Sequence, residues 1–299
     1  PFLCYYNHNM NEENKNKKPT IAFFGSPQLA VDILNELKNR GGSTPTDLMP
    51  SLIITQPDRK SGRKMIFTPS PVKIWADENG IPALQPEKLD DEFISKLKSQ
   101  NWDLFIVAAY GKIIPQSILD IPQKGTLNVH PSLLPKYRGA TPIHSSILNG
   151  DKETGVSIIL LDEKMDHGPI LAQEKITLWE NTILEIPSQS KLEKTLPQLG
   201  GKLLRDSIPK WLNDEIKPIE QDHSKATFCE KLKSTDALID LNEDAQENFL
   251  KIQAFDKWPK AHYFENGKRI LIKKARLENN RLILEKIIPE GESEITLNS

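Results

Sequence analysis

Short apolar runs alternate with helix-like stripes along residues 20–178. The runs have the length of buried strands and lie at 20–24, 52–55, 102–109, 126–130 and 156–161. Between them, apolar residues follow helical spacing at 29–37, 72–78 and 142–148. Strands that alternate with helices are typical of βαβ units. The pattern therefore predicts an α/β fold with a mostly parallel sheet.

The pattern changes after this region. Residues 188–213 have the apolar spacing of a covering helix, although Pro197 and the Gly200-Gly201 pair are expected to break or bend it. Short strand-like pieces follow at 262–264, 269–274 and 281–284, separated by turn residues such as Asn266-Gly267. We therefore expect a disordered tail at 1–19, a first domain at 20–208, a linker at 209–225 and a small β-barrel at 226–299.

Composition narrows the class of protein. No apolar run approaches the roughly 18–20 residues that a membrane-spanning helix needs. Cys4 and Cys229 are far apart and form no CxxC, which argues against disulfides and favours a reducing, cytoplasmic location. The six histidines lack metal-ligand spacing, so we expect no metal.

Charge is distributed unevenly. The net charge is −2, but residues 251–286 hold ten basic against four acidic residues, and residues 56–73 hold five against one. Such islands are often only solvated faces, but they also suit a polyanionic partner such as RNA.

Several catalytic motifs are missing. The first predicted strand ends in Gly25-Ser26-Pro27 and lacks the GxGxxG of dinucleotide-binding folds. The sequence also has no GxxxxGK[ST] and no GxSxG. Nicotinamide chemistry, P-loop hydrolysis and α/β-hydrolase chemistry are therefore disfavoured.

Two polar residues end a predicted strand. Asn128 and His130 are two positions apart, so their side chains lie on the same side of that strand. They stand at its carboxyl end, where open α/β sheets bind ligands. An amide can stabilise an oxyanion, and an imidazole can take a proton. An ordinary capping Asn and strand-end His remain the alternative from this triplet alone.

The flanking sequence carries a family resemblance. NVHPSLLPKYRGA at 128–140 and MDHG at 165–168 resemble the formyltransferases that use 10-formyltetrahydrofolate. TQPDRKSGRKMIFTPSPVK, VAAYGKIIP, NGDKETGVSI, FCEKLKSTDALID and AFDKWPKAHY extend the resemblance over about residues 20–290 and are similar to the members that act on methionyl-tRNA. The resemblance implies a Rossmann-like catalytic domain, an OB-like C-terminal domain, 10-formyltetrahydrofolate as co-substrate and initiator Met-tRNA as partner of a monomer.

The resemblance also implies residue roles. Asn128 would bind the formyl oxygen, His130 would polarise it or take the amine proton, and Asp166 would orient His130. The folate site would use Val107, Ala108, Ala109, Tyr110, Ser132, Leu133, Leu134, Pro135 and Asp162. Contacts with tRNA would come from Arg59, Lys60, Arg63, Lys64, Lys268, Arg269, Lys273 and Lys274.

Two other functions stay open. A formyltransferase for amino-sugar nucleotides would share the catalytic residues, although it should not need a basic β-domain. An RNA-binding module on an inactive scaffold would tend to lose one of Asn128, His130 and Asp166, and all three are present. The chain stops soon after residue 289, so we expect the last element of the C-terminal domain to be missing.

Overall fold

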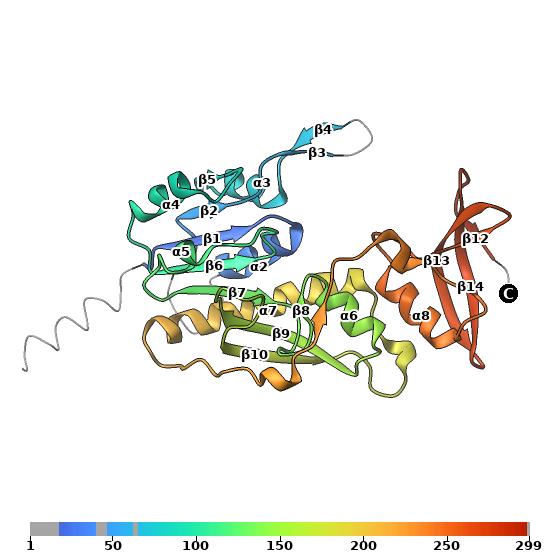
Figure 1. Ribbon diagram of the computed structural model, residues 1–299. Helices are drawn as coiled ribbons and strands as arrows, with labels where there is room; N and C mark the ends of the chain where they lie inside the picture. Colours follow the sequence, from blue (N-terminus) through green and yellow to red (C-terminus); the bar gives the residue numbers. More distant parts are fainter. Residues whose placement is uncertain (1–17, 40–46, 62–64, 298–299) are drawn as a thin grey trace, which may run out of the picture.

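A seven-stranded sheet forms the centre of the larger part of the molecule (Figure 1). The computed structural model describes residues 18–39, 47–61 and 65–297, so the expected tail lies outside the described residues apart from its last two positions. The strands of this sheet are β1 (Ile21–Gly25), β2 (Leu52–Ile54), β5 (Ala83–Leu84), β6 (Leu104–Ala108), β7 (Thr126–His130), β9 (Glu153–Leu160) and β10 (Ile170–Thr177).

The order of the strands is β10-β9-β7-β6-β1-β2-β5. The strands from β7 to β5 pair in parallel, whereas β9 and β10 pair antiparallel at the other side. This confirms the mostly parallel α/β sheet. The carboxyl ends of β1, β6 and β7 therefore meet at one edge, which is where a ligand site is expected in such sheets.

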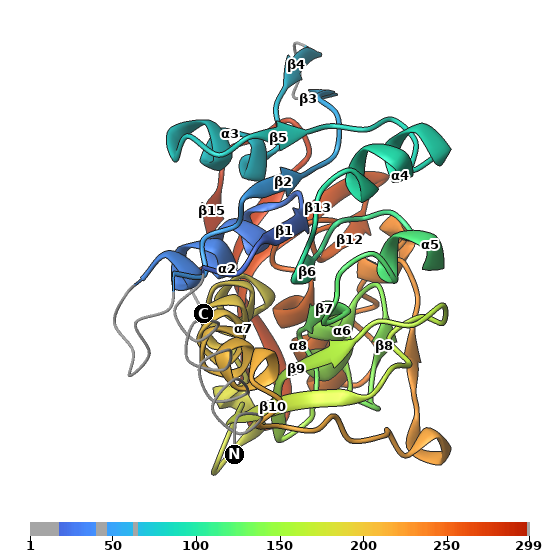
Figure 2. The same ribbon diagram turned by 90° about the vertical axis from the view of Figure 1, so that its left-hand side faces the viewer.

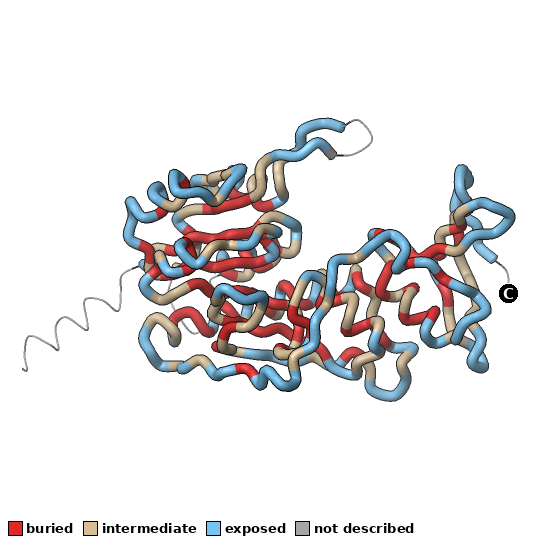
Figure 3. The backbone as a smooth tube through the Cα atoms, in the orientation of Figure 1, coloured by how far each residue is buried: buried red, intermediate tan, exposed pale blue. Residues whose placement is uncertain are grey.

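Helices cover both faces of the sheet, as Figure 2 shows with α2 and α7 on one side and α4 and α5 on the other. Buried residues follow the strands and the helix faces packed on them (Figure 3). The side chains of β1 alternate between the two faces of the sheet. Ile21 and Phe23 join the core on the side of α2 and α7, and Ala22 and Phe24 join the core on the side of α4 and α5. The helices are α2 (Gln28–Lys38), α3 (Pro71–Glu78), α4 (Asp91–Lys98), α5 (Gln116–Leu119), α6 (Pro142–Leu148) and α7 (Gln189–Leu212).

Helix α7 is continuous, contrary to the break or bend expected from its sequence. It runs through Pro197 and also through residue 208, where we expected the first domain to end. Its two central glycines permit close packing: a Cβ on Gly200 would lie 2.7 Å from Val129, and one on Gly201 would lie 2.6 Å from Glu36. Burial against the sheet and α2 outweighs the roughly 1 kcal/mol that each helical glycine costs.

The C-terminal part is a four-stranded antiparallel sheet with the order β12-β13-β14-β15. Asn266-Gly267 and Asn279-Asn280 make its tight turns, all with positive φ, which confirms the predicted hairpin signals. We expected a small β-barrel of the OB type; the described strands form an antiparallel β-sheet, with β12 and β15 at its edges. Its elements are α8 (Ala245–Ala254), β12 (His262–Glu265), β13 (Lys268–Glu278), β14 (Arg281–Pro289) and β15 (Ile295–Thr296).

Two smaller strand pairs complete the structure. The basic loop predicted at 56–71 contains the hairpin of β3 (Arg59–Ser61) and β4 (Ile66–Thr68), which projects from the body in Figure 1. The strands β8 (Arg138–Gly139) and β11 (Phe228–Cys229) pair in parallel. Within the described ranges, no helix is both long and apolar enough to cross a membrane, and no group of His, Cys, Asp and Glu could hold a metal ion.

Candidate active site

Three polar side chains converge at the carboxyl end of β7. The Asn128 amide Nδ2 lies 3.4 Å from Asp166 Oδ1, and His130 Nδ1 lies 3.6 Å from Asp166 Oδ2. Asn128 and His130 are 9% and 4% exposed, so the group is largely shielded from water. The structure thus brings together the three residues that the sequence singled out, although Asp166 is 38 positions from Asn128.

The ring of His130 has a fixed orientation. Its Nε2 lies 2.9 Å from the carbonyl oxygen of Tyr137. Because a carbonyl oxygen can only accept, Nε2 carries the hydrogen of that bond. The other nitrogen, Nδ1, faces Asp166 and is the one available for proton transfer.

Asp166 occupies an unusual backbone conformation. Its φ is +48°, in the left-handed region that Asp tolerates better than most non-glycine residues. The backbone N–H of Gly139 donates to Asp166 Oδ2 at 2.8 Å and so fixes the carboxylate. Ala109 and Tyr137, also near this edge, have positive φ as well. Such strain persists only where the surroundings over-determine it, as at active sites.

The segment from Ser132 to Pro135 is anchored to the strands beneath it. The Ser157 hydroxyl on β9 donates to the Ser132 carbonyl at 2.7 Å and accepts from the Leu134 N–H at 3.1 Å. Gln173 on β10 donates to the Leu134 carbonyl at 3.0 Å. Sequence reasoning missed Ser157 and Gln173; for Ser157 the available signal was a polar residue within the apolar run of β9, whereas Gln173 lies in a polar stretch of β10 and gave no such signal.

The end of β6 lies directly beside the three residues, because Val107 pairs with Asn128. The Tyr110 carbonyl accepts from the Gln56 amide at 3.0 Å. Burial raises the pKa of the Tyr110 phenol to about 12, so this hydroxyl stays protonated and is not an acid or base near neutral pH. Ala109 is exposed between the buried Ala108 and Tyr110.

The loop between β9 and β10 carries Asp162 as well as Asp166. Asp162 Oδ2 lies 2.7 Å from His167 Nδ1, and Asp162 Oδ1 accepts from the Lys164 N–H at 2.9 Å. The Asp162 carboxylate therefore stabilises the loop from within.

Residues beyond the expected first domain also build the site, and sequence reasoning missed them. The Thr227 hydroxyl accepts from the Tyr137 N–H at 2.8 Å. The half-buried Cys229 lies on β11, which pairs with Arg138 and Gly139, and burial raises the pKa of its thiol. The buried Gln221 donates to the backbone of the Asp166 loop. The segment from 219 to 229 thus lies against the segment that follows β7.

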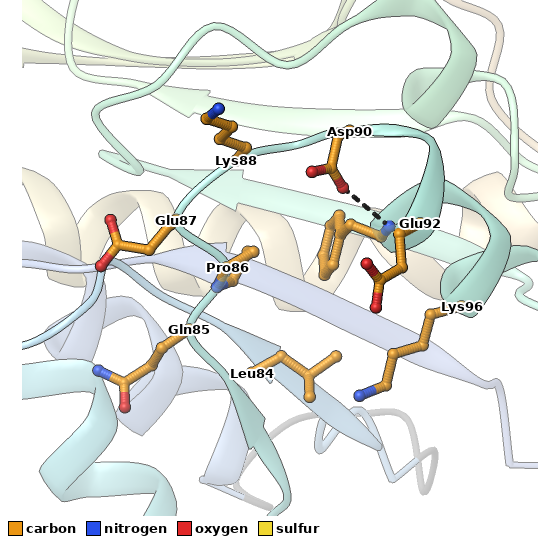
Figure 4. Close-up of a pocket in the computed structure, with 9 residues that line it drawn as sticks. Leu84, Gln85, Pro86, Glu87, Lys88, Asp90, Glu92 and Lys96 are labelled. Carbon is orange, nitrogen blue, oxygen red and sulfur yellow. Dashed lines mark hydrogen bonds between the residues drawn. The ribbon is translucent and has the colours of Figure 1, made fainter.

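A separate pocket of about 440 Å³ lies between β5 and α4 (Figure 4). It is lined by Leu84, Gln85, Pro86, Glu87, Lys88, Asp90, Glu92, Phe93 and Lys96. None of these residues was predicted for the site, and none belongs to the cluster around Asp166. This pocket is therefore separate from the side chains that converge at the end of β7.

The basic residues of the projecting hairpin are exposed. Arg59 and Lys60 lie on β3, and the Lys60 ammonium lies 5.5 Å from the centre of the Phe67 ring. Met65 and Phe67 are 61% and 64% exposed, so this hairpin presents apolar as well as basic groups. Arg63 and Lys64 lie outside the described residues.

The basic residues of β13 differ among themselves. Lys268 forms an ion pair with Glu292 at 3.4 Å, and Lys274 forms one with Glu285 at 2.8 Å. The half-buried Arg269 donates inward to the Pro259 carbonyl at 3.1 Å. Lys273 is exposed, so it is the best placed of the four predicted residues to bind a phosphate.

Comparison with known sequences identifies the family. Residues 18–205 match the family model of formyl transferase, and residues 231–294 match that of the formyl transferase C-terminal domain. A methionyl-tRNA formyltransferase from Bacillus velezensis is 40% identical over 253 residues, which are 84% of this chain and 76% of that protein. One from a Sulfurovum species is 43% identical over 244 residues, 81% of this chain and 75% of that protein.

Solved structures share the fold at lower identity. A methionyl-tRNA formyltransferase from Clostridium thermocellum aligns with a TM-score of 0.60 and 18% identity, over 92% of this chain and 100% of that one. An N-formyltransferase from Helicobacter canadensis, in complex with folinic acid and dTDP-3-aminofucose, aligns with a TM-score of 0.65 and 18% identity, over 93% of this chain and 98% of that one.

Proposed function

Since this chain belongs to the methionyl-tRNA formyltransferase family, we propose that it transfers the formyl group of 10-formyltetrahydrofolate to the amino group of methionyl-tRNA. The observation that carries the proposal is the convergence of Asn128, His130 and Asp166 at the carboxyl end of β7. Two related enzymes at about 40% identity carry this name.

The three residues have the chemistry that acyl transfer to an amine requires. The Asn128 amide donates to the formyl oxygen as negative charge develops there, which lowers the barrier. His130 takes the proton of the attacking amine at Nδ1, because its Nε2 is bound to the Tyr137 carbonyl. Asp166 stabilises the imidazolium that results, and the imidazolium gives the proton to N10 of the folate as the bond between N10 and the formyl carbon breaks. The amine itself is the nucleophile, so the protein needs to supply none.

The folate co-substrate supplies the formyl group, and the residues at this edge suit a planar heterocycle with amide-like groups. The exposed, left-handed Ala109 directly follows β6, the strand that pairs with β7 at Asn128. The Ser132–Pro135 segment and the loop from Asp162 to Asp166 border the same three residues. We propose that these segments bind 10-formyltetrahydrofolate, and that no metal takes part.

The other parts of the chain are proposed to bind the tRNA. The projecting hairpin, with Arg59 and Lys60, would contact the acceptor end, and β13 would contact phosphates through Lys273. We propose a catalytic domain from residue 20 to the end of α7, a linker from there to residue 225 and a tRNA-binding domain at 226–299, acting as a cytoplasmic monomer on initiator Met-tRNA.

An acceptor-competition assay tests the proposal. The protein is mixed with 10-formyltetrahydrofolate and either charged initiator Met-tRNA or an amino-sugar nucleotide. Formyl-Met-tRNA formation that falls steeply with added salt supports the proposal, because phosphate contacts release counterions. Transfer to the sugar alone would keep the chemistry and overturn the acceptor. Transfer to neither acceptor would overturn the proposed activity.

A further inference from the structure

We propose that Gln221 and Arg138 are positioning residues that hold Asp166 in place to act on His130, an inference that rests on the proposed formyl transfer. Gln221 lies in the polar segment expected to be a linker, and Arg138 lies on β8. Neither touches the reacting groups. Both are only 4% exposed, although they are polar or charged.

Gln221 is bonded to the backbone of the Asp166 loop. Its amide Nε2 donates to the Asp166 carbonyl at 2.9 Å and to the Gly168 carbonyl at 2.7 Å. Both amide hydrogens are therefore used on two carbonyls that flank His167. A side chain that holds both carbonyls fixes the turn that carries the Asp166 carboxylate.

Arg138 fixes the orientation of that amide. Its Nε and Nη2 donate to Gln221 Oε1 at 3.1 and 2.7 Å, so the amide oxygen must face the guanidinium and the NH₂ must face the loop. The next residue, Gly139, donates its N–H to Asp166 Oδ2. Asp166 is thus held at its backbone through Gln221 and at its carboxylate through the neighbour of Arg138.

The residues on both sides of Gln221 also contact the Asp166 loop or the strand that follows it. Before it, Ile219 exchanges two backbone hydrogen bonds of 2.8 Å with Ile170. After it, the His223 ring stacks on the His167 ring, with centroids 4.1 Å apart and planes 9° apart. Arg138 Nη2 also donates to His223 Nδ1 at 2.8 Å, which joins the stack to the Gln221 contact.

These contacts matter for catalysis because Asp166 is not in a relaxed conformation. Its left-handed φ of +48° is disfavoured for a residue with a Cβ. The carboxylate lies 3.6 Å from His130 Nδ1, so a small shift of the loop separates the pair. A displacement of about 1 Å can cost about 10²-fold in rate.

The substitution Gln221→Glu keeps the contact with Arg138 and removes the contact with the Asp166 loop. A carboxylate still accepts from Arg138, but it turns an oxygen instead of an NH₂ toward the Asp166 and Gly168 carbonyls. We expect kcat for Met-tRNA to fall about 10²-fold, with the KM for Met-tRNA nearly unchanged. We also expect the His130 imidazole signals in the NMR spectrum, assigned by their loss in His130→Asn, to shift.

Two further variants separate positioning from stability. Gln189 on α7 is also 4% exposed and donates to Glu193, in a part of the chain that does not contact Asp166. Gln189→Leu is the control for Gln221→Leu: both lose a buried amide, and only the second should lower kcat and move the His130 signals. Arg138→Lys keeps the charge but loses the two-pronged contact, and we expect it to resemble Gln221→Glu.

The outcomes are distinguishable. If the wild-type protein forms no formyl-Met-tRNA, the proposed function fails, while the NMR comparison still tests the positioning. If the wild type is active and the Gln221 variants lose only as much activity as Gln189→Leu at a matched loss of Tm, with unchanged His130 signals, the positioning role is overturned. A shift of those signals together with a selective loss of kcat supports it.

Discussion

Replacing Asn128 by Ala is expected to slow catalysis while leaving stability nearly unchanged. If the amide donates to the developing oxyanion, its loss should lower kcat by about 10²–10³, which is about 2.7–4 kcal/mol of barrier. The same amide contributes little to the folded state. Its bond to Asp166 is 3.4 Å long, so we expect the free energy of unfolding to fall by at most about 1 kcal/mol.

The control lies on the same strand. Thr126 is two residues before Asn128 on β7, is 2% exposed, and donates to the Leu119 carbonyl at 3.0 Å. Thr126→Ala leaves that buried carbonyl without its partner, at a cost of about 1–3 kcal/mol in unfolding free energy. It removes nothing that reaches the formyl group, so kcat should stay near the wild-type value.

Formylation of charged Met-tRNA with both substrates saturating measures kcat, and a single turnover with the enzyme in excess isolates the chemical step. Urea unfolding of the same samples measures stability. We expect the two variants to rank oppositely in kcat and in the free energy of unfolding: Asn128→Ala should be slow but stable, and Thr126→Ala should be active but less stable. A kcat for Asn128→Ala close to that of the wild type would refute the oxyanion role. A loss of stability larger than that of Thr126→Ala would show that the amide is mainly structural.

Three other predictions concern Asp166, His144 and the basic residues of the projecting hairpin. Asp166→Asn should keep the Gly139 contact but lose the charge that stabilises the imidazolium, so kcat should fall strongly in the same assay while Tm changes little. Burial lowers the pKa of His144, so its unfolded form binds more protons below about pH 6.5; unfolding free energy should fall as pH drops from 7 to 5, and His144→Leu should weaken this dependence. Arg59→Ala with Lys60→Ala should raise the KM for Met-tRNA and reduce the slope of log binding constant against log salt by about 1 to 2, leaving folate binding unchanged.

The sheet could be predicted because its strands are nearly continuous apolar runs. Each of the five runs between 20 and 161 overlaps a strand of the central sheet, since strands buried on both faces have few polar positions. Helix α7 was harder. Gly200 and Gly201 disfavour a helix locally, and only the closeness of Val129 and Glu36 explains why they are tolerated.

The site was predictable to the extent that its residues adjoin a strand or a motif. Asn128 and His130 end a strand, so alternation alone places them together. Asp166 was identified only through the family resemblance, because its place depends on a turn with positive φ. The role of Ser157 depends on a contact with a segment 25 residues away, which no local pattern records.

The linker segment shows a more general reason for the failure of local patterns. A polar stretch without periodicity is typical of a solvated connection, and residues 214–225 have that composition. Gln221 is nevertheless buried, because both of its amide hydrogens and its oxygen have partners within 3.1 Å. Its burial costs little once every polar atom is bonded. A polar segment that has the composition of a loop can therefore be buried beside an active site, because its polar side chains bind the backbone of another segment. If so, the part of the chain that connects the two domains also sets the geometry of the first, and Asp166 should respond to changes made in the linker.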